Sequence, residues 1–330
     1  MRHSKPRVFV TRVIPDAGLT LLEKHTDADV WPHDRAPTRE ELVRGAKNAD
    51  ALVTLLTEKV DADVLAAAPR VRIVANVAVG FDNFDVAAAT KAGVVMTNTP
   101  GVLDDTTADL AFALLLCTAR RLAEGDRLMR TGAWDGWGIM QLLGHDVHHA
   151  TLGIVGFGRI GRGVARRALG FDMTVLYADE FPASPEVERE LHVTRVPLDE
   201  LLARSDFVTL HTPLLPGTKH LINAQSLEKM KRTACLINTS RGPVIDEAAL
   251  VQALRSGTIA GAGLDVYEHE PKMAPGLAEL DNVVILPHIG SASYATRGKM
   301  AQMAASNVIA FFEGKTPPNA LNPEALTRPT

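Results

Sequence analysis

The sequence predicts an α/β fold with two doubly wound domains, each built on a parallel sheet. Two observations support this prediction. The chain has 330 residues, which is more than one hydrophobic core usually organises. Short apolar runs also alternate with helix-compatible segments along nearly the whole chain, and a second such series begins near residue 151. Buried parallel strands have near-continuous apolar sequences, and the crossover between two of them is usually a helix.

The first half of the chain contains five runs with the composition of buried strands. They span residues 7–14, 28–32, 49–56, 71–80 and 93–100. The segments AGLTLLEKH, TREELVRGA and DADVLAAA between them have the apolar spacing of helices. One long core helix is then expected from Asp104 to Gly132, with Asp104 or Thr106 as its N-cap and Arg127 and Arg130 in its last turn.

The second series contains six further runs of this kind. They span residues 151–158, 173–179, 206–213, 234–240, 261–267 and 282–288. A last helical run, ATRGKMAQMAASNVIAFFEGK, precedes a tail rich in proline and asparagine. We expect this tail to lie on a surface without secondary structure.

The composition favours a cytoplasmic protein. A formal net charge of -4 gives no electrostatic reason to expect nucleic acid or an anionic membrane as a partner. The two cysteines, Cys117 and Cys235, lie in apolar runs, which predicts buried thiols in a reducing compartment rather than a disulfide. No run approaches the roughly 18 apolar residues of a membrane span, and the first residues lack the apolar segment of a signal peptide.

Three histidines lie close together in the sequence before residue 151. His145, His148 and His149 occupy a polar connection with only Asp146 as an acidic neighbour. Metal sites built on histidine usually recruit cysteine or further carboxylate ligands. We therefore expect a solvated loop and no metal.

A glycine motif follows the apolar run LGIVGF and opens a helical segment. Gly156, Gly158 and Gly161 form the pattern G-x-G-x-x-G between a strand and a helix, the context that a dinucleotide-binding loop requires. The first glycine permits the tight turn, the second lets the main chain approach a pyrophosphate, and the third lets the helix pack on the strand. The alternative is a tight turn without a ligand.

Asp179 ends the next predicted strand. An acidic side chain there accepts hydrogen bonds from the ribose hydroxyls and repels a 2′-phosphate. Glu180 follows it, and no Arg or Lys appears before Arg189. The sequence therefore predicts NAD, with NADH preferred over NADPH. The alternative is that Asp179 caps the end of the strand.

Three further strand ends carry the residue types that reduction of a 2-keto acid requires. Arg241 offers a guanidinium, whose fork shape suits a carboxylate. His288 offers an acid that is effective near neutral pH, and Glu270 offers a carboxylate to orient the imidazole. Taken singly, Arg241 is equally compatible with a salt bridge at a helix start, and His288 with a buried strand-end histidine.

Seven segments together resemble the D-isomer-specific 2-hydroxyacid dehydrogenase family over essentially the whole chain. They are VGFDNFD at 79–85, TNTPGVLDDTTADLA, the glycine motif, HTPL at 211–214, NTSRGPVIDEAAL, LDVYEHEP and LPHIGSAS. The resemblance implies that Arg241 holds the substrate carboxylate, that His288 is the general acid in reduction, and that Glu270 pairs with it.

The resemblance also implies roles for residues around this triad. The main-chain N–H groups of Val79 and Gly80 would bind the substrate, and Ser291 would line its pocket. Asp265 would bind the nicotinamide carboxamide. The remaining implied cofactor contacts, besides the three glycines and Asp179, are Thr107, Arg159, Ile160, His211, Thr212, Pro213, Thr239 and Gly290.

The domain organisation is likewise implied by the family. Residues 101–287 would form a Rossmann-like NAD-binding domain inserted into a flavodoxin-like substrate domain made of residues 1–100 and 288–330, with a cleft between the two. Members of the family are usually dimers, so we expect a homodimer in which the helix after Asp104 contributes to the contact.

Within the family, the chain looks most like glyoxylate and hydroxypyruvate reductases. Asn76 and Val79 stand where phosphoglycerate and phosphite dehydrogenases have a cation for their anionic substrates. Trp134 and Trp137 fit either a substrate pocket or the surface of a dimer arm. A different 2-keto acid remains an alternative, as do a formate-type dehydrogenase and an NAD-sensing corepressor-like binding protein with this fold.

Overall fold

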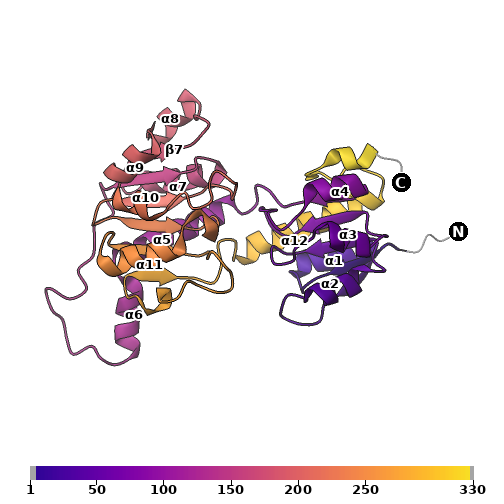
Figure 1. The fold of residues 1–330 in the computed structure, drawn as a ribbon, viewed down its shortest axis with the longest axis horizontal. Helices are drawn as coiled ribbons and strands as arrows, with labels where there is room; N and C mark the ends of the chain where they lie inside the picture. The colour runs from indigo at the N-terminus through magenta and orange to yellow at the C-terminus, as the bar shows by residue number, and fades with distance from the viewer. Residues whose placement is uncertain (1–4, 328–330) are drawn as a thin grey trace. The chain divides into compact units, whose positions relative to one another are not determined.

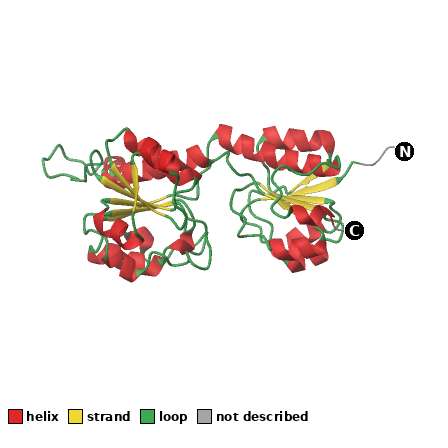
Figure 2. Cartoon of the chain, turned by 90° about the horizontal axis from the view of Figure 1, so that it is seen from above, coloured by secondary structure: helices red, strands yellow, loops and turns green. Residues whose placement is uncertain are grey.

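The computed structural model describes residues 5–327 and divides into two compact units. Unit 1 comprises residues 1–103 and 291–330, and unit 2 comprises residues 104–290. Each unit is a parallel sheet with helices on both of its faces (Figure 2). The predicted fold class is therefore confirmed.

Unit 1 contains a five-stranded parallel sheet with the order β2-β1-β3-β4-β5. The central strands are buried along their whole length, which explains their continuous apolar sequences. The strands are β1 (Arg7–Val10), β2 (Asp27–Val30), β3 (Ala51–Thr54), β4 (Ile73–Asn76) and β5 (Val95–Thr97). The helices are α1 (Asp16–His25), α2 (Arg39–Ala46), α3 (Ala62–Ala67), α4 (Val86–Ala92) and α12 (Tyr294–Phe312).

Helix α12 joins the C-terminal part of the chain to unit 1. Figure 1 shows it in yellow among the indigo N-terminal elements. It packs on α1, where a Cβ added to Gly18 would lie 2.5 Å from the main-chain carbonyl of Ala301. The two helices approach so closely at Gly18 that only glycine fits.

The tail after α12 does not lie on a surface, as the sequence suggested. Asn322 is fully buried, and its side chain accepts from the N–H of Met96 (2.7 Å) and donates to the carbonyl of Val94 (2.9 Å). The tail then forms a short 3-10 helix, Pro323–Thr327. The prediction was wrong because Asn322 satisfies buried main-chain groups at β5 that are distant in the sequence.

Unit 2 contains a seven-stranded parallel sheet with the order β12-β11-β10-β9-β6-β7-β8. Its strands are β6 (Thr151–Val155), β7 (Thr174–Ala178), β8 (Val193–Arg195), β9 (Phe207–Leu210), β10 (Cys235–Asn238), β11 (Gly261–Leu264) and β12 (Val283–Ile285). The strand order reverses at β6, which is the position where open α/β sheets bind ligands. Strand β8 lies outside the six predicted runs because it has three residues, of which only Val193 is buried.

Nine described helical elements surround this sheet or connect its strands. The longer ones are α5 (Asp104–Ala119), α7 (Arg159–Leu169) and α11 (Glu247–Ser256). The shorter α-helices are α6 (Leu122–Arg130), α8 (Pro185–Leu191), α9 (Leu198–Arg204) and α10 (Ala224–Glu228). Two 3-10 helices, Gly242–Val244 and Leu277–Glu279, complete the described elements, and α12 begins beyond the unit.

The single helix predicted from Asp104 to Gly132 is two helices. Arg121 has φ of 53°, in the left-handed region, and this residue separates α5 from α6. Helix α5 is packed against the sheet, whereas α6 has no buried residue. The apolar pattern continues across the break, so the change in direction was not visible in the sequence.

Both cysteines are free, and they differ in burial. Cys235 is buried, which raises the pKa of its thiol to about 12, whereas Cys117 is only half-buried. The expectation of a second fully buried thiol was therefore wrong. Within residues 5–327, no helix has the length and apolar character needed to cross a bilayer.

The packing of α1 on α12 gives a test with two glycines. Gly18→Ala should lower the free energy of unfolding by about 1–3 kcal/mol, because the added methyl group overlaps the main chain of α12. Gly298→Ala, on α12 itself, is the matched control, since its Cβ would meet only Ala17 at 3.9 Å. It should raise the free energy of unfolding by roughly 0.5–1 kcal/mol. Urea denaturation measures both, and equal effects would contradict the packing described.

Candidate active site

Most of the predicted site residues lie at one edge of the sheet of unit 2, where its strands have their carboxyl ends. All its strand pairs are parallel, so the segments that follow each strand emerge on the same side. The glycine motif follows β6, and Asp179 follows β7. His211 and Thr212 follow β9, Thr239 and Arg241 follow β10, Asp265 follows β11, and His288 follows β12.

His288 and Glu270 form a pair. Nδ1 of the imidazole lies 2.9 Å from Oε2 of the carboxylate. The other oxygen of Glu270 accepts a hydrogen bond from the main-chain N–H of Tyr267 (3.2 Å). The pair engages Nδ1, so Nε2 is the ring nitrogen that remains to meet a substrate. His288 has φ of 54°, a conformation that non-glycine residues adopt mainly where the surroundings enforce it.

The surroundings of Glu270 keep its carboxyl ionised. Partial burial acts to raise the pKa of Glu270, but the hydrogen bond and positive charge of His288, the N–H of Tyr267 and the charge of Arg241 together lower it below its ordinary value. A carboxylate in this state stabilises the charged form of the imidazole beside it. This is the arrangement that a histidine acting as a general acid requires.

Asp265 holds the segment that carries His288. Its side chain is fully buried, and its two oxygens accept the N–H groups of Ile289 and Gly290, each at 2.7 Å. Burial raises the pKa of this carboxyl, opposed by these N–H groups and by the charge of His288. Thr107, on α5, donates to the carbonyl of Gly290 (3.2 Å) and holds the same segment from a second direction.

Two hydrogen bonds to nearby residues of the same segment hold Arg241 in place. The side chain of Asn238 donates to the carbonyl of Arg241 (2.9 Å), and its guanidinium donates to the carbonyl of Ser240 (2.8 Å). A Cβ on the next residue, Gly242, would overlap the main chain of Tyr267. The segment with Arg241 therefore packs directly against the segment with Glu270, and the charge of Arg241 acts on that carboxyl.

A second pair of the same kind lies in unit 2. His220 Nε2 and Glu268 Oε1 are 2.6 Å apart, and the main-chain N–H of Glu268 donates to Glu247 (2.8 Å). Glu268 and Glu270 are two residues apart in the sequence EHE, and of the two only Glu270 was expected to pair with His288. The structure assigns Glu268 to His220 and Glu270 to His288.

The glycine motif has the geometry that a diphosphate needs. Gly156 has φ of 89°, and a Cβ there would lie 2.7 Å from the carbonyl carbon of His211, while a Cβ on Gly161 would overlap the carbonyl of Gly156. A Cβ on Gly158 would meet nothing within 4 Å. The N-terminus of α7 therefore faces open space across a residue without a side chain, which fits an anion held by main-chain N–H groups.

Two buried hydroxyl groups near this edge also fit a dinucleotide. Thr212 and Thr239 have buried Oγ1 atoms without a hydrogen-bond partner among the described residues. Buried polar groups usually have partners, so these two are available to a ligand. Directly before Thr212, burial lowers the pKa of His211 to about 3, and its Nε2 lies 2.9 Å from Thr209 Oγ1. His211 is therefore an uncharged neighbour of the site.

A pocket of about 510 Å³ adjoins Asp179. Its lining includes Asp179, Glu180, Arg195, Pro197, Thr212 and Leu221. The carboxylate of Asp179 accepts the N–H groups of Phe157 (2.6 Å) and Phe181 (2.9 Å), which ties the end of β7 to the glycine motif. Arg159 forms an ion pair with Asp104 (3.0 Å).

Arg195 also lines this pocket and is not among the site residues predicted from the sequence. Its guanidinium donates to the carbonyls of Asp179 (2.8 Å) and Glu180 (3.1 Å). Strand β8 pairs with β7 and places Arg195 opposite Tyr177, although Arg195 lies well beyond the residues that follow Asp179 directly. Recognition of β8 as a strand would have revealed this cation.

The remaining predicted residues lie elsewhere. Val79, Gly80 and Ser291 belong to unit 1. Trp134 and Trp137 lie in the loop after α6 with 46% and 79% of their surface exposed, so no pocket within unit 2 encloses them.

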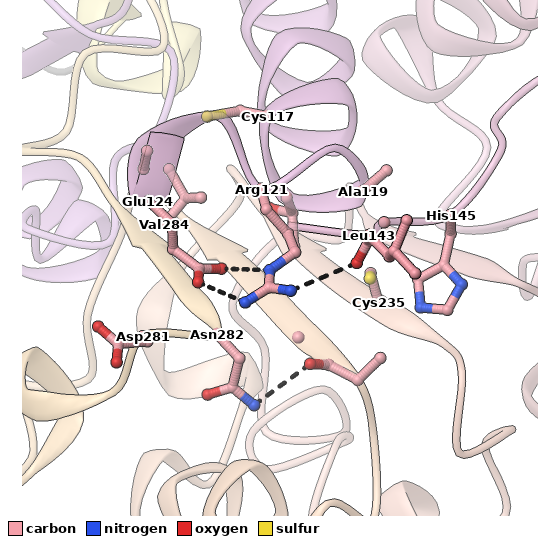
Figure 3. A pocket seen from close by; sticks show the side chains of 15 residues that line it. Cys117, Ala119, Arg121, Glu124, Leu143, His145, Cys235, Asp281, Asn282 and Val284 are labelled. Carbon is pink, nitrogen blue, oxygen red and sulfur yellow. Dashed lines mark hydrogen bonds and ion pairs between the residues drawn. The ribbon is translucent and has the colours of Figure 1, made fainter. Parts of the chain in front are cut away.

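A smaller pocket of about 240 Å³ lies at the opposite edge of the same sheet (Figure 3). Its lining includes both cysteines, Arg121, Glu124 and His145. Arg121 donates to both oxygens of Glu124 (2.9 and 2.7 Å), so the two charges satisfy each other. His148 and His149 stack edge to face, and no group of three potential metal ligands occurs among residues 5–327.

Comparison with known proteins gives one consistent result. The family model for "D-isomer specific 2-hydroxyacid dehydrogenase, NAD binding domain" matches residues 112–290. A glyoxylate reductase of Korarchaeum cryptofilum is 54% identical, over 98% of this chain and 97% of the relative. The solved structure of a glyoxylate reductase from Paecilomyes thermophila has a TM-score of 0.84 and 33% identity, over 96% of this chain and 98% of that one.

A further solved structure contains ligands. It is an NADPH-dependent glyoxylate/hydroxypyruvate reductase from Sinorhizobium meliloti in complex with NADP and malonate. Its TM-score is 0.86 and its identity 33%, over 99% of this chain and 100% of that one.

Proposed function

Because the chain belongs to the D-isomer-specific 2-hydroxyacid dehydrogenase family, we propose that it reduces a small 2-keto acid, glyoxylate or hydroxypyruvate, with NADH. The observation that carries this proposal is the pair of His288 with an ionised Glu270, next to the charge of Arg241, at the same sheet edge as the glycine motif. The names of the relatives favour glyoxylate. The binding-protein alternative is not favoured, because the similar relatives are named as reductases.

In this proposal, unit 2 supplies the cofactor site and the catalytic triad. Arg241 binds the substrate carboxylate, and its charge also polarises the carbonyl group. The chemistry that NADH supplies when bound is a hydride for the carbonyl carbon. His288 donates the proton on Nε2 to the carbonyl oxygen, so the product is a 2-hydroxy acid and the histidine is left neutral. In the oxidative direction the same nitrogen accepts the hydroxyl proton.

Unit 1 contributes the substrate-binding residues in this proposal. The N–H groups of Val79 and Gly80 bind the substrate, and Ser291 lines its pocket. Asn76 and Val79 provide no cation for a phosphate or phosphite group. Small, singly charged keto acids are therefore the favoured substrates.

Activity measurements test the triad with a matched control. Purified protein should oxidise NADH with glyoxylate or hydroxypyruvate. His288→Asn should lower kcat by about 100-fold or more, because a general acid typically contributes that much. His220→Asn removes the other histidine that is paired with a glutamate, and it should leave kcat nearly unchanged. Absence of turnover with any 2-keto acid, or equal loss in both variants, would contradict the assignment.

Replacement of the other two triad members, Arg241 and Glu270, should change different kinetic parameters. Arg241→Ala should chiefly raise KM, because it removes the partner of the carboxylate. Glu270→Gln removes the negative charge paired with Nδ1 of His288, so the imidazole loses the partner that stabilises its charged form. The kcat for reduction should then fall with little change in KM. An unchanged kcat would show that Glu270 does not act on His288.

We also propose that NADH is preferred over NADPH. Asp179 and Glu180 line the pocket next to the glycine motif, and their negative charges oppose a 2′-phosphate. Arg195 lies in the same pocket and opposes this preference, because a guanidinium is a good phosphate ligand. Its guanidinium donates two hydrogen bonds to main-chain carbonyl groups, which hold it close to Asp179.

The ratio of kcat/KM with NADH to kcat/KM with NADPH measures this cofactor preference. NADH should be favoured by roughly tenfold or more, which corresponds to about 1.4 kcal/mol. Asp179→Ser should reduce the ratio, and Arg195→Gln should increase it by weakening only the use of NADPH. Equal use of both cofactors by the unmodified chain would refute the preference.

Finally, we propose that the chain forms a homodimer through α6 and the loop that follows it. Helix α6 buries none of its residues, and the apolar side chains here are largely exposed: Leu122, Met129, Trp137, Ile139 and Met140. Contiguous exposed apolar surface of this kind marks an interaction site.

Sedimentation should give the mass of two chains. Met129→Asp with Ile139→Asp should give the mass of one, because the charges disfavour burial of this surface. Phe181→Asp, which changes an equally exposed apolar residue elsewhere in unit 2, is the control and should leave the mass unchanged. A single-chain mass for the unmodified protein would exclude the dimer.

A further inference from the structure

In the loop that follows β4 in unit 1, three successive carbonyl groups accept hydrogen bonds, whereas two N–H groups have no partner among the described residues. The carbonyls of Ala78, Val79 and Gly80 each accept a hydrogen bond. The main-chain N–H groups of Val79 and Gly80 donate to no partner among the described residues. We propose that Asn76 and Asn98 are positioning residues that hold this loop so that its N–H groups bind the substrate carboxylate. This inference rests on the proposed function.

The segment after β5 fixes the direction of both N–H groups. The N–H of Thr99 donates to the carbonyl of Ala78 (2.9 Å), and Nδ2 of Asn98 donates to the carbonyl of Val79 (2.7 Å). In a trans peptide, the C=O of one residue and the N–H of the next point in opposite directions. The N–H groups of Val79 and Gly80 therefore both point away from the Asn98–Thr99 segment.

Asn76 fixes the other end of the loop. Its side chain is fully buried, and its Nδ2 donates to the carbonyl of Gly80 (3.0 Å) and to Oδ1 of Asn83 (3.2 Å). Its Oδ1 accepts from the hydroxyl of Thr54 (3.3 Å). Both ends of the amide are used, so the orientation of Asn76 is determined.

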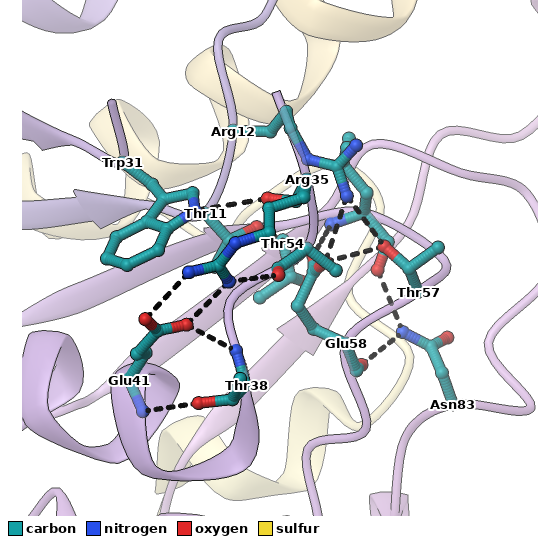
Figure 4. Close-up of polar contacts among 12 residues, drawn as sticks. Thr11, Arg12, Trp31, Arg35, Thr38, Glu41, Thr54, Thr57, Glu58 and Asn83 are labelled. Atoms are coloured by element: carbon teal, nitrogen blue, oxygen red, sulfur yellow. Dashed lines mark hydrogen bonds and ion pairs between the residues drawn. The ribbon is translucent and has the colours of Figure 1, made fainter. Parts of the chain in front are cut away.

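A buried network supports Asn76 in turn (Figure 4). Asn83 donates to the carbonyls of Leu55 (3.1 Å) and Glu58 (2.9 Å). The carboxylate of Glu58 is 3% exposed and accepts from the hydroxyl of Thr11 (2.6 Å) and the N–H of Leu55 (2.7 Å). These contacts connect the loop to the ends of β1 and β3, so it is ordered before any ligand binds.

A loop held in this way suits a small carboxylate. Two N–H groups directed to one side provide partial positive charge without a side-chain cation. Such donors bind an anion best when their orientation is fixed beforehand, because binding then requires no reorganisation.

The experiment uses the full chain with NADH, and oxamate as a non-reducible analogue of a 2-keto acid. Selective ¹⁵N labelling of valine and glycine reports the amides of Val79 and Gly80 directly. In the unmodified chain both resonances should shift on addition of oxamate. If they stay in place while turnover is normal, the carboxylate binds elsewhere. The inference is then overturned together with the substrate contact proposed for this loop, whereas the proposed reductase activity stands.

The variant Asn98→Asp keeps the size of the side chain but removes the donor to Val79. It should raise KM for glyoxylate by roughly tenfold or more with little change in kcat, because a buried carbonyl loses its partner and the loop loses its orientation. NADH affinity should be unchanged. Asn98→Ser, whose hydroxyl still offers a donor, should show a smaller rise in KM and provides the comparison if the aspartate variant does not fold.

Asn322→Asp is the matched control. Asn322 is an equally buried asparagine of unit 1 that donates to Val94 and Thr90 and makes no contact with the loop. It should lower stability without raising KM. An equal rise of KM in both aspartate variants would show that Asn98 has only a structural role. If the unmodified chain reduces no 2-keto acid, shifted amides still support the anion site, and unshifted amides refute it together with the proposed function.

Discussion

The site of unit 2 depends on the two hydrogen bonds that the buried carboxylate of Asp265 accepts from Ile289 and Gly290. A buried carboxyl group is unfavourable unless it is well paired, and here both oxygens take main-chain N–H groups at 2.7 Å. The two bonds fix the residues directly after His288, which has a left-handed main chain. The position of the imidazole is thus set by a residue at the end of a neighbouring strand.

The surroundings of His288 also depend on which of two nearby glutamates pairs with it. Two glutamates separated by one residue each take a histidine, and their environments differ. Glu268 belongs to a network with His220 and Glu247 that ties loops together. Glu270 is exposed to the charges of His288 and Arg241, which hold its pKa below the ordinary value. The same residue types in nearly the same place therefore have different electrostatic surroundings, because their neighbours differ.

Both units place main-chain N–H groups where an anion is expected. In unit 2, α7 begins at Arg159 behind a glycine whose Cβ would meet open space. In unit 1, the side-chain amides of Asn76 and Asn98 donate to carbonyl groups of the loop after β4. The N–H groups of Val79 and Gly80 in this loop donate to no described partner. Main-chain donors lack the rotational freedom of a lysine, so they select by geometry as well as by charge. In unit 2, the side chains of Arg241 and Arg195 add positive charge to that of the main-chain donors.

The sequence by itself determined the alternation of strands and helices, the glycine motif and the candidates at the strand ends, because these depend on local periodicity and on short motifs. It did not determine the break at Arg121, strand β8 with Arg195, or the insertion of Asn322 beside β5. The pairing of Glu270 with His288 was implied by the family resemblance, and the tertiary structure brings the two side chains to 2.9 Å. These features were decided by contacts between residues distant in the sequence, where the pairing of buried polar groups outweighs local preference.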